Sequence, residues 1–321
     1  MKLLVTGAFG NIGNNTIVNL IQQGHQVRCF DIKNEASEEA AAKFAGKIEM
    51  IWGDIRNAAD VSAAVQDMDV VVHLAAIIPI ESEINPDFAR EVNVGGTQNV
   101  VSEMKKLSPA PKLIFASSTT VFGYTQDREP PLKITDPVNP TNNYTNHKVE
   151  CEQIIQESGL TWCIMRFAAV TTIEFKPNPM LFYISLDSRM EFTHTRDASL
   201  AVANAASSDK VWGKILLIGG GARNQIRYRD YIHRSMDAAG VGRFPDEAFG
   251  SIPATPDWID TSESQALLNY QHHTFDDWLN DRVASMGPKR DEIISQRDKI
   301  RKEMLDQSPY YKAAHEEKQQ G

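Results

Sequence analysis

The stretch Thr6-Gly7-Ala8-Phe9-Gly10-Asn11-Ile12-Gly13 decides the fold of this 321-residue chain. It lies between an apolar segment that predicts a strand and a segment that predicts a helix. The first glycine permits a tight turn, the second lets the backbone approach a phosphate, and the third lets the helix pack closely on the strand. The helix N-terminus then presents N–H groups and a positive dipole end to an anion. The stretch therefore predicts a turn that binds the pyrophosphate of a nucleotide.

Acidic residues after the next two predicted strands point to a dinucleotide. Asp31 ends the second strand, 18 residues past the last glycine of the turn. A carboxylate there accepts hydrogen bonds from both ribose hydroxyls of adenosine and repels a 2′-phosphate, so it favours NAD over NADP. Arg28 and Lys33 lie nearby in the sequence and are expected to offset part of that repulsion. Asp54 and Ile55 follow the third strand, where an adenine ring would lie, although a helix N-cap is an alternative role for Asp54.

Strand and helix patterns alternate through the first half of the chain. Strands are predicted at 2–6, 25–31, 48–52, 69–74, 112–117 and 161–166, and helices at 11–23, 37–45, 58–66, 88–107 and 144–158. The strands are continuous apolar runs such as Asp69-Val-Val-Val-His-Leu74, which are typical of strands buried on both faces of a parallel sheet. The alternation predicts an α/β fold with a doubly wound parallel sheet of the Rossmann type.

The regular strand and helix pattern ends in the second half of the chain, which suggests a division into regions. Prolines interrupt the pattern after Arg166, and only a helix at 197–206 and a strand at 214–218 are still regular. We expect an NAD-binding Rossmann domain, a smaller C-terminal substrate-binding region and a charged helical tail. Their expected boundaries are 1–170 with 192–219 for the first, 171–191 with 220–286 for the second, and 287–321 for the tail.

The tail has a sparse apolar stripe. Ile293, Ile300 and Met304 recur at helical spacing among charged residues. The pattern predicts a solvated helix that packs weakly on the body, or alternatively a subunit contact or an active-site lid. Positive and negative charges nearly cancel, so membrane contact is not expected.

Composition and charge exclude several function classes. The chain has 33 Lys and Arg against 42 Asp and Glu, a formal net charge of −9, and such a surface does not attract nucleic acid. Cys29, Cys151 and Cys163 fit neither a disulfide framework nor a zinc site, and they suit a reducing compartment. The N-terminus begins with a strand pattern rather than a secretory signal, and no apolar run is long enough to span a bilayer. We therefore expect a cytoplasmic protein without a metal site.

A tyrosine and a lysine mark the predicted catalytic end. Tyr144 and Lys148 stand four residues apart at the start of a predicted helix, so they share one face. A free tyrosine has a pKa of roughly 10 and is a poor base at neutral pH. A nearby ammonium and a positively charged nicotinamide ring would both stabilise the phenolate. Tyr144 is then able to take the proton of an alcohol as hydride leaves.

A hydroxyl-rich loop follows the fifth predicted strand. Ser117 and Ser118 stand where that strand ends, and ligands of α/β sheets sit beyond the carboxyl ends of the strands. A hydroxyl there is able to orient a substrate oxygen.

In their order along the chain, these motifs resemble the extended short-chain dehydrogenase/reductase family, the group of NAD-dependent epimerases and dehydratases. The resemblance covers about residues 1–285. Its further motifs are His73-Leu74-Ala75-Ala76, Asn93-Val94-x-Gly96-Thr97, Phe192-Thr193-His194-x-x-Asp197 and Ile218-Gly219-Gly220-Gly221. It implies that Ser118, Tyr144 and Lys148 are catalytic, and that Asn93 helps to build the active site. The expected cofactor contacts are Gly7, Phe9, Gly10, Asn11, Ile12, Gly13, Asp31, Asp54, Ile55, Leu74, Ala75, Ala76, Ser117, Tyr144 and Lys148.

The chain departs from the family members that act on nucleotide sugars. Those members usually carry an Asn shortly after the sixth-strand Arg, where this chain has Ala169. They often have an Arg for the diphosphate where this chain has Met190, with Arg189 only adjacent. These departures weaken the case for a nucleotide-sugar substrate and leave the redox site intact.

Three hypotheses follow. The first is an NAD-dependent oxidoreductase that interconverts a secondary alcohol and a ketone. The second is a nucleotide-sugar epimerase, or less favoured a dehydratase, with tightly held NAD. The third is a non-catalytic NAD sensor, which the presence of Ser118, Tyr144 and Lys148 disfavours. The resemblance also implies a homodimer formed through the helices at 88–107 and 144–158.

Overall fold

The central feature of the molecule is a parallel β-sheet. The computed structural model describes residues 1–175 and 178–313. The strands of the sheet are β1 (Lys2–Thr6), β2 (Gln26–Asp31), β3 (Glu49–Trp52), β4 (Val70–His73), β5 (Lys112–Ser118), β6 (Trp162–Phe167) and β8 (Lys214–Ile218). In the described part of the chain they form a seven-stranded sheet in the order β3-β2-β1-β4-β5-β6-β8, with every neighbouring pair parallel. The predicted doubly wound α/β fold is confirmed.

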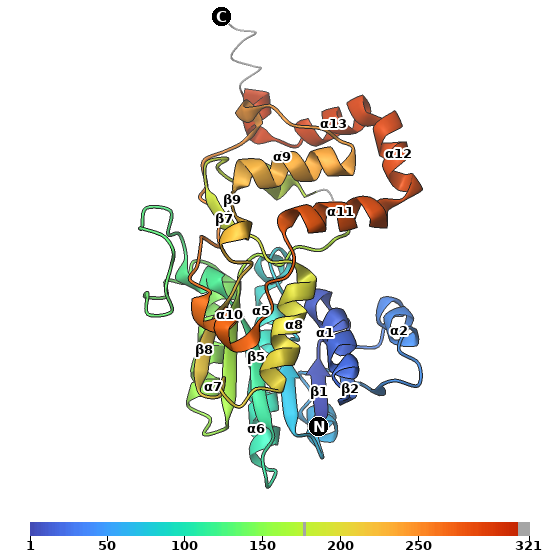
Figure 1. Ribbon diagram of the computed structural model, residues 1–321, viewed down its shortest axis with the longest axis vertical. Helices are drawn as coiled ribbons and strands as arrows, with labels where there is room; N and C mark the ends of the chain where they lie inside the picture. The colour runs from blue at the N-terminus through green and yellow to red at the C-terminus, as the bar shows by residue number, and fades with distance from the viewer. Residues whose placement is uncertain (176–177, 314–321) are drawn as a thin grey trace, which may run out of the picture.

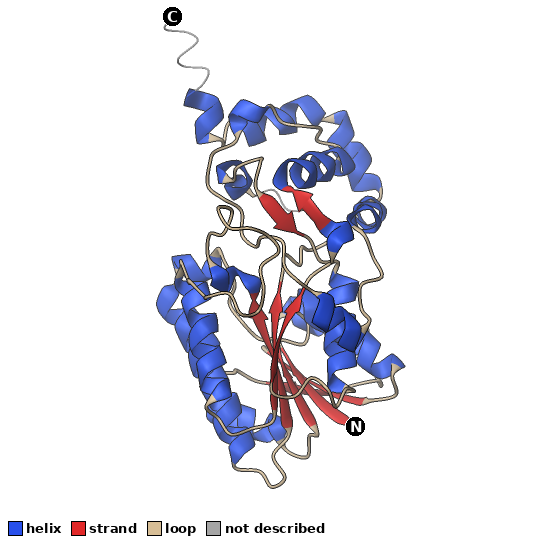
Figure 2. Cartoon of the chain, turned by 60° about the vertical axis from the view of Figure 1, so that its left-hand side comes forward, coloured by secondary structure: helices blue, strands red, loops and turns tan. Residues whose placement is uncertain are grey.

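Helices cover both faces of this sheet (Figure 2). One face packs against α1 (Asn11–Gln22), α8 (Thr195–Ala206) and α10 (Ser262–Leu268), and the other against α3 (Ala58–Val65), α6 (Gly96–Lys105) and α7 (Asn143–Gln156). A further helix, α2 (Glu35–Ala42), follows β2.

The double cover explains the apolar strands. Leu3 and Val5 belong to the core beneath α1, while Leu4 between them belongs to the core on the opposite face. Val70 and Val72 alternate with Val71 in the same way. Because successive side chains of a strand point to opposite faces, a strand buried on both faces needs apolar residues throughout.

The long helix predicted at 88–107 is present with an irregular turn inside it. A short helix, α4 (Glu81–Ile84), precedes α5 (Pro86–Arg90), which continues through a π-helical turn, η1 (Glu91–Gly95), into α6. A π turn holds one residue more than an α turn, and such turns are frequent at functional sites. Asn93 lies within it.

A smaller layer sits beyond the carboxyl ends of the parallel strands (Figure 1). Its strands β7 (Arg189–Glu191) and β9 (Gln225–Arg227) pair antiparallel, and α9 (Tyr228–Ala239) and α11 (Phe275–Met286) pack beside them. Short 3₁₀ turns lie at Thr119–Phe122, Pro179–Tyr183, Ala222–Asn224 and Asp246–Ala248. The layer has its own core around Phe182, Ile232 and Met236.

The charged tail packs more closely than a solvated helix would. Its described part forms α12 (Pro288–Ser295) and α13 (Arg297–Leu305), which lie over α9 (Figure 1). Ile293 and Met304 are buried in the core of the smaller layer. Arg290 donates to the carbonyl of Ala238 at 2.7 Å, and Arg297 donates to that of Gly240 at 2.8 Å. The expectation of weak packing is therefore wrong for these helices, and residues 314–321 of the predicted tail lie outside the described residues.

The strand order places the site. β1 lies between β2 and β4, so the chain winds away from β1 in both directions. Ligands of open α/β sheets bind beyond the carboxyl ends of the strands at this switch point. Among the described helices, none is long and apolar enough to cross a membrane.

Candidate active site

The glycine turn after β1 is tightly packed. Gly7 has a φ of +62°, and a Cβ on it would lie 2.7 Å from Ala75 Cα. A Cβ on Gly13 would lie 2.5 Å from the carbonyl oxygens of Gly7 and Ala8. Gly10 precedes α1, whose first residues face a cavity. Only glycine fits at both packed positions, so the turn has the form that a phosphate-binding loop needs.

Two adjoining cavities run along the carboxyl edge of the sheet in the described part of the chain. One, of about 380 Å³, is lined by the N-terminus of α1 and by Ser118, Tyr144 and Lys148. The other, of about 350 Å³, is lined by Asp31, Asp54 and other residues after β2 and β3. The cavities share Gly7, Gly10, Leu74 and Ala76. Together they make one extended cleft that joins the predicted nucleotide end to the predicted catalytic end.

Asp31 is anchored by the backbone around it. Its carboxylate accepts from Phe9 N and from Ile32 N, both at 2.9 Å. Burial raises the pKa of Asp31, and these two hydrogen bonds oppose that rise. Arg28 is engaged elsewhere, since it pairs with Glu49 and donates to the carbonyls of Ala64 and Gln66 at the end of α3.

The second cation expected near Asp31 also has another partner. Lys33 lies 3.3 Å from Glu38. The expected offset of the 2′-phosphate repulsion by Arg28 and Lys33 is therefore not seen, which strengthens the preference for NAD.

Asp54 has a partner that the sequence analysis missed. Arg56 donates to both carboxylate oxygens of Asp54, to Oδ2 at 2.6 Å and to Oδ1 at 3.1 Å, and the hydrogen bonds lower the pKa of Asp54. Arg56 also pairs with Glu91 at 3.2 Å and stacks over Phe88. Ile55 is buried and lines the same cavity. Asp54 therefore reaches the cleft as part of an ion pair, and Arg56 lines the cavity beside it.

Tyr144 and Lys148 face the cleft from the first turns of α7, which Asn142 caps through a capping box. Lys148 Nζ lies 5.6 Å from the centre of the Tyr144 ring and donates to the carbonyl of Ala116 at 2.6 Å. Burial raises the pKa of Tyr144 to about 12, and a hydrogen bond with the Ser118 side chain opposes it. Burial lowers the pKa of Lys148 to about 8. Tyr144 is therefore protonated at neutral pH until further positive charge reaches it.

The two serines at the end of β5 point in different directions. Ser118 Oγ contacts Thr120 Oγ1 at 2.7 Å and remains at the cleft beside Tyr144. Ser117 lines the cleft as well, but its hydroxyl donates to Glu152 at 2.5 Å. Glu152 is in turn paired with Arg166 at 2.7 Å, and all of these side chains are buried. Of the two serines, Ser118 is therefore the one whose hydroxyl lies beside Tyr144 at the cleft.

Asn93 acts on the loop after β4 rather than on the cleft. Its amide oxygen accepts from Ile77 N at 2.7 Å, and its amide nitrogen donates to Ile77 O at 2.9 Å. This pair of bonds fixes the segment that starts at Leu74-Ala75-Ala76, which lines the cleft. Asn93 therefore ties the π-helical turn to the loop after β4.

A carboxylate from α4 holds the start of α7. Glu83 Oε1 accepts from Tyr144 N at 3.1 Å, and Glu83 Oε2 accepts from Asn143 N at 3.2 Å and from its amide at 3.0 Å. A negative charge at a helix N-terminus is favourable. Glu83 lies about 60 residues before α7 in an irregular segment, so nothing in the sequence marks it as a partner.

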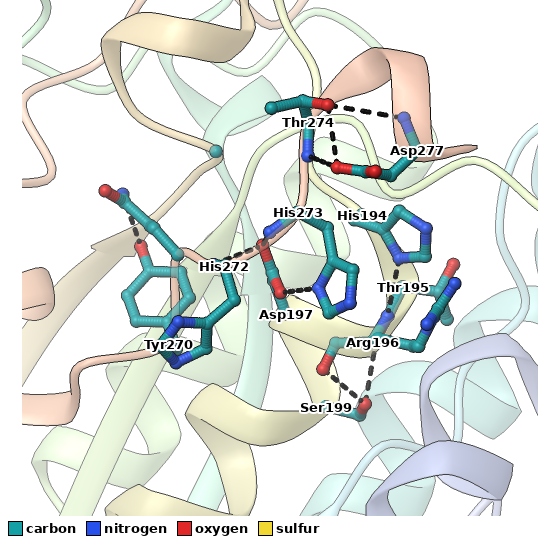
Figure 3. A network of polar contacts seen from close by, with 12 residues as sticks. His194, Thr195, Arg196, Asp197, Ser199, Tyr270, His272, His273, Thr274 and Asp277 are labelled. Carbon is teal, nitrogen blue, oxygen red and sulfur yellow. Dashed lines mark hydrogen bonds and ion pairs between the residues drawn. The ribbon is translucent and has the colours of Figure 1, made fainter. Parts of the chain in front are cut away.

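The segment His194–Asp197 is structural. Asp197 is fully buried and accepts from the backbone N–H groups of His272 and His273 at 3.0 and 2.9 Å, and it contacts the His273 ring at 2.5 Å (Figure 3). It thereby joins α8 to the segment before α11. No group of three metal-binding side chains is found among the described residues.

The positions that would serve a diphosphate are occupied differently. Arg189 forms two hydrogen bonds of 2.7 Å with the buried Asp257, and it donates to the carbonyls of Thr125 and Arg128. Met190 is buried in the apolar core of the smaller layer. Neither side chain lines the cleft.

Comparisons with known proteins agree with this geometry. Residues 4–179 match the model of the 3-beta hydroxysteroid dehydrogenase/isomerase family. Over 167 residues the chain is 30% identical to UDP-glucose 4-epimerase 3 of Oryza sativa subsp. japonica, covering 49% of this chain and 44% of that protein. It is also 30% identical over 176 residues to a 3-beta-hydroxysteroid dehydrogenase of Mycolicibacterium neoaurum, covering 51% of this chain and 46% of that protein. The chain thus spans about half the length of these curated relatives.

Solved structures share the fold over most of the chain. A UDP-glucuronic acid 4-epimerase from Bacillus cereus superimposes with a TM-score of 0.74 at 22% identity, covering 90% of this chain and 100% of that one. A dTDP-glucose 4,6-dehydratase from Streptomyces venezuelae gives a TM-score of 0.75 at 20% identity, covering 91% of this chain and 98% of that one. At these identities the likeness is one of fold.

Proposed function

Since the chain belongs to the 3-beta hydroxysteroid dehydrogenase/isomerase family of extended short-chain dehydrogenases/reductases, we propose that it is an NAD-dependent oxidoreductase that interconverts a secondary alcohol and a ketone. The observation that carries this proposal is the cleft that joins Asp31 at one end to Ser118, Tyr144 and Lys148 at the other. A sensor of NAD would need only the first end.

The residues present fit the dinucleotide. The packed glycine turn and the N-terminus of α1 suit a pyrophosphate. Asp31 keeps lone pairs for the adenosine ribose while its two backbone hydrogen bonds fix its position. When bound, NAD supplies the acceptor or donor of the hydride.

The protein's own groups then move the proton. Tyr144 Oη takes the proton of the substrate alcohol, or returns it in the reverse direction. Ser118 Oγ holds the substrate oxygen. Lys148 holds the nicotinamide ribose, and its ammonium, 5.6 Å from the centre of the Tyr144 ring, favours the phenolate over the phenol. Asn93 keeps the loop after β4 in place.

Replacing Tyr144 with Phe tests the proposal. The ring is kept and only the hydroxyl is lost, so folding and NAD affinity should barely change, while turnover falls by roughly 10²–10⁴-fold. Tyr124→Phe is the matched control, because Tyr124 is 49% exposed and does not line the cleft. Turnover is followed as reduced nicotinamide formed from secondary alcohols. Full activity of the Tyr144→Phe variant would refute the assignment.

A nucleotide-sugar epimerase is the second candidate, because relatives of that printed activity match about half of the chain. Against it stand Arg189, which Asp257 engages, and Ala169 in place of the family's Asn. UDP- and dTDP-sugars are therefore expected to bind poorly. Epimerisation of any sugar in such a panel, with NAD retained through purification, would establish the second candidate instead.

We also propose a cytoplasmic homodimer. The cysteines at 29, 151 and 163 are all free and buried, which suits a reducing compartment. The dimer contact is expected on α5, α6 and α7. A bidentate pair between Arg90 and Glu150, at 2.7 Å, joins α5 to α7. Phe88 on α5 is 42% exposed. Light scattering at micromolar concentration should give twice the chain mass, and a monomer would contradict the proposal.

A further inference from the structure

A third cavity, of about 580 Å³, lies in the smaller layer next to the cleft. Pro79 lines both spaces, and Val170 of the cleft is followed directly by Thr171 of this cavity. We call it the upper chamber. Its volume is in the range of cavities that hold small organic ligands. The rest of a substrate held at Tyr144 and Ser118 would enter it.

The walls of the upper chamber are mostly apolar. They include Phe175, Leu181, Ile184, Tyr228, Ile232 and Met236. At its mouth the loop after β4 leaves Ile78 59% exposed and Ile80 46% exposed. Ile78 lines the cleft and Ile80 lines the chamber. Exposed apolar residues gathered at a cavity mouth indicate a ligand that covers them.

A buried cation interrupts this apolar surface. Arg282 on α11 lines the chamber and is 6% exposed. Its guanidinium donates to the carbonyls of Ile173 at 3.1 Å and Thr172 at 3.2 Å, and it stacks 4.0 Å from the centre of the Trp278 ring. None of the ion pairs formed within residues 1–175 and 178–313 includes it. Burial lowers the pKa of Arg282, which reflects the cost of holding its charge away from water.

A buried hydroxyl without a hydrogen-bond partner among the described residues also lies in the wall of the upper chamber. Ser235 on α9 is 1% exposed and lines the chamber. Its hydroxyl has no hydrogen-bond partner within the described part of the chain. Buried hydroxyls are normally satisfied, so an orphan hydroxyl in a cavity wall indicates a missing ligand group. Arg282 and Ser235 therefore give the chamber a buried guanidinium without an ion pair among the described residues and a buried hydroxyl without a hydrogen-bond partner. The remaining polar side chains in its walls are Thr171, Thr172, Glu174, Asn178, Thr255 and the two tyrosines Tyr228 and Tyr231.

We propose that the upper chamber binds the body of the substrate, and that the substrate is an amphiphilic acid with a secondary hydroxyl or keto group at Tyr144 and a carboxylate at Arg282. This inference rests on the proposed function. A guanidinium is the side chain best suited to a carboxylate, since its planar fork forms two parallel hydrogen bonds. A ligand carboxylate would also give Arg282 an ion-pair partner, which it lacks among the described residues although Glu174 lines the same chamber.

The other reading of Arg282 is a purely structural one. In that reading the guanidinium only ties the segment 172–174 to α11 through backbone carbonyls. Both readings predict that loss of Arg282 lowers stability. Only the proposed reading predicts that the protein distinguishes an acid from its uncharged ester.

The experiment compares ligands that differ in that charge alone. The probes are 11-hydroxydodecanoate and 4′-(1-hydroxyethyl)biphenyl-4-carboxylate, each beside its methyl ester. Binding to the protein saturated with NADH is measured by calorimetry, so that no hydride leaves the alcohol. At least one acid should bind roughly tenfold or more tightly than its ester, as expected for hydrogen bonds to a charged group. If neither acid binds more tightly than its ester, the proposal is wrong.

Variants test whether Arg282 is the cation that binds the carboxylate of the acid. Arg282→Met should reduce the affinity for the acid to that of the ester and leave NADH binding unchanged. Arg243→Met is the control, since Arg243 is an exposed residue paired with Asp237 and should leave the acid preference intact. Arg282→Lys keeps the charge and should keep part of the preference. Retention of the full preference by a folded Arg282→Met variant would overturn the proposal.

A variant at a second position tests the same chamber if the Arg282 variants fail to fold. Ser235→Leu fills the chamber without changing its charge, so it should weaken both acid and ester by roughly tenfold. Unchanged binding of both would place the ligand outside the chamber and overturn the proposal. Failure of NADH binding in the unaltered protein would instead refute the proposed function. Oxidation of uncharged alcohols without acid preference would leave that function standing and refute only the acid.

Discussion

Replacing Lys148 with Met should make the protein more stable and its binding of NAD weaker. Lys148 is 4% exposed, and burial lowers its pKa from 10.5 to about 8. One unit of pKa corresponds to about 1.4 kcal/mol, so the buried charge costs the folded state about 3 kcal/mol. The Met variant loses the hydrogen bond to Ala116 O, which costs about 1–3 kcal/mol. We expect a net gain of about 1 kcal/mol at pH 7.

The pH dependence gives the sharper test. The folded-state pKa of Lys148 lies below its unfolded value, so the wild-type protein carries the full penalty below about pH 8 and loses it as pH rises toward 10.5. The advantage of the Met variant should therefore shrink by about 1.4 kcal/mol per pH unit above pH 8 and change sign near pH 9.

The assay is guanidinium unfolding of the protein without NAD, from pH 6 to 10. Lys299→Met serves as the control, because Lys299 is 71% exposed and its replacement should change stability by less than about 0.5 kcal/mol. Calorimetry should show NAD binding weakened by roughly tenfold or more in Lys148→Met. A variant that is less stable than wild type by the same amount at every pH would refute the reasoning, because Lys148 would then not be a desolvated charge.

Three further outcomes are expected. Replacing Asp31 with Ser removes the charge that opposes a 2′-phosphate, so the ratio of NAD to NADP affinity should fall by roughly tenfold or more in calorimetry, and an unchanged ratio would show that Asp31 does not face the ribose. Glu83→Gln should lower the free energy of unfolding at pH 7 by about 0.5–1 kcal/mol. Because hydrogen bonds lower the folded-state pKa of Glu83, this difference should disappear as pH falls below about 4.5. A difference that persists in acid would contradict the role of the carboxylate. Arg189→Met should destabilise the protein by about 3–5 kcal/mol, since it leaves Asp257 buried without its partner, and a stable variant that loses only ligand affinity would indicate a binding role.

The sequence predicts those parts of the fold in which local pattern and packing agree. The three valines at 70–72 form a continuous apolar run because both faces of the strand are covered. The glycine turn is recognisable because Gly7 and Gly13 have no room for a side chain. The same applies to Tyr144 and Lys148, whose spacing on one helix sets their common direction.

The contacts that the sequence does not reveal are long-range and side-chain specific. Glu83 reaches Tyr144 N, and Arg189 reaches Asp257, across segments that no local pattern relates. Arg28 lies near Asp31 in the sequence, yet its position on β2 directs it to Glu49. Nearness in sequence gives no information on side-chain direction until the register of neighbouring strands is known.

The π-helical turn at Glu91–Gly95 fixes the number of residues that this segment must contain. One residue of an α-helix advances its direction by about 100°. The additional residue of the π turn lets Asn93 meet Ile77 while Val100 and Met104, further along the helix, still face the sheet. Deleting one residue here would rotate the half of the helix that carries Asn93 by about a quarter turn. The loop would then lose its anchor although no chemical group had been replaced, so the length of this segment is under the same constraint as the identity of Asn93.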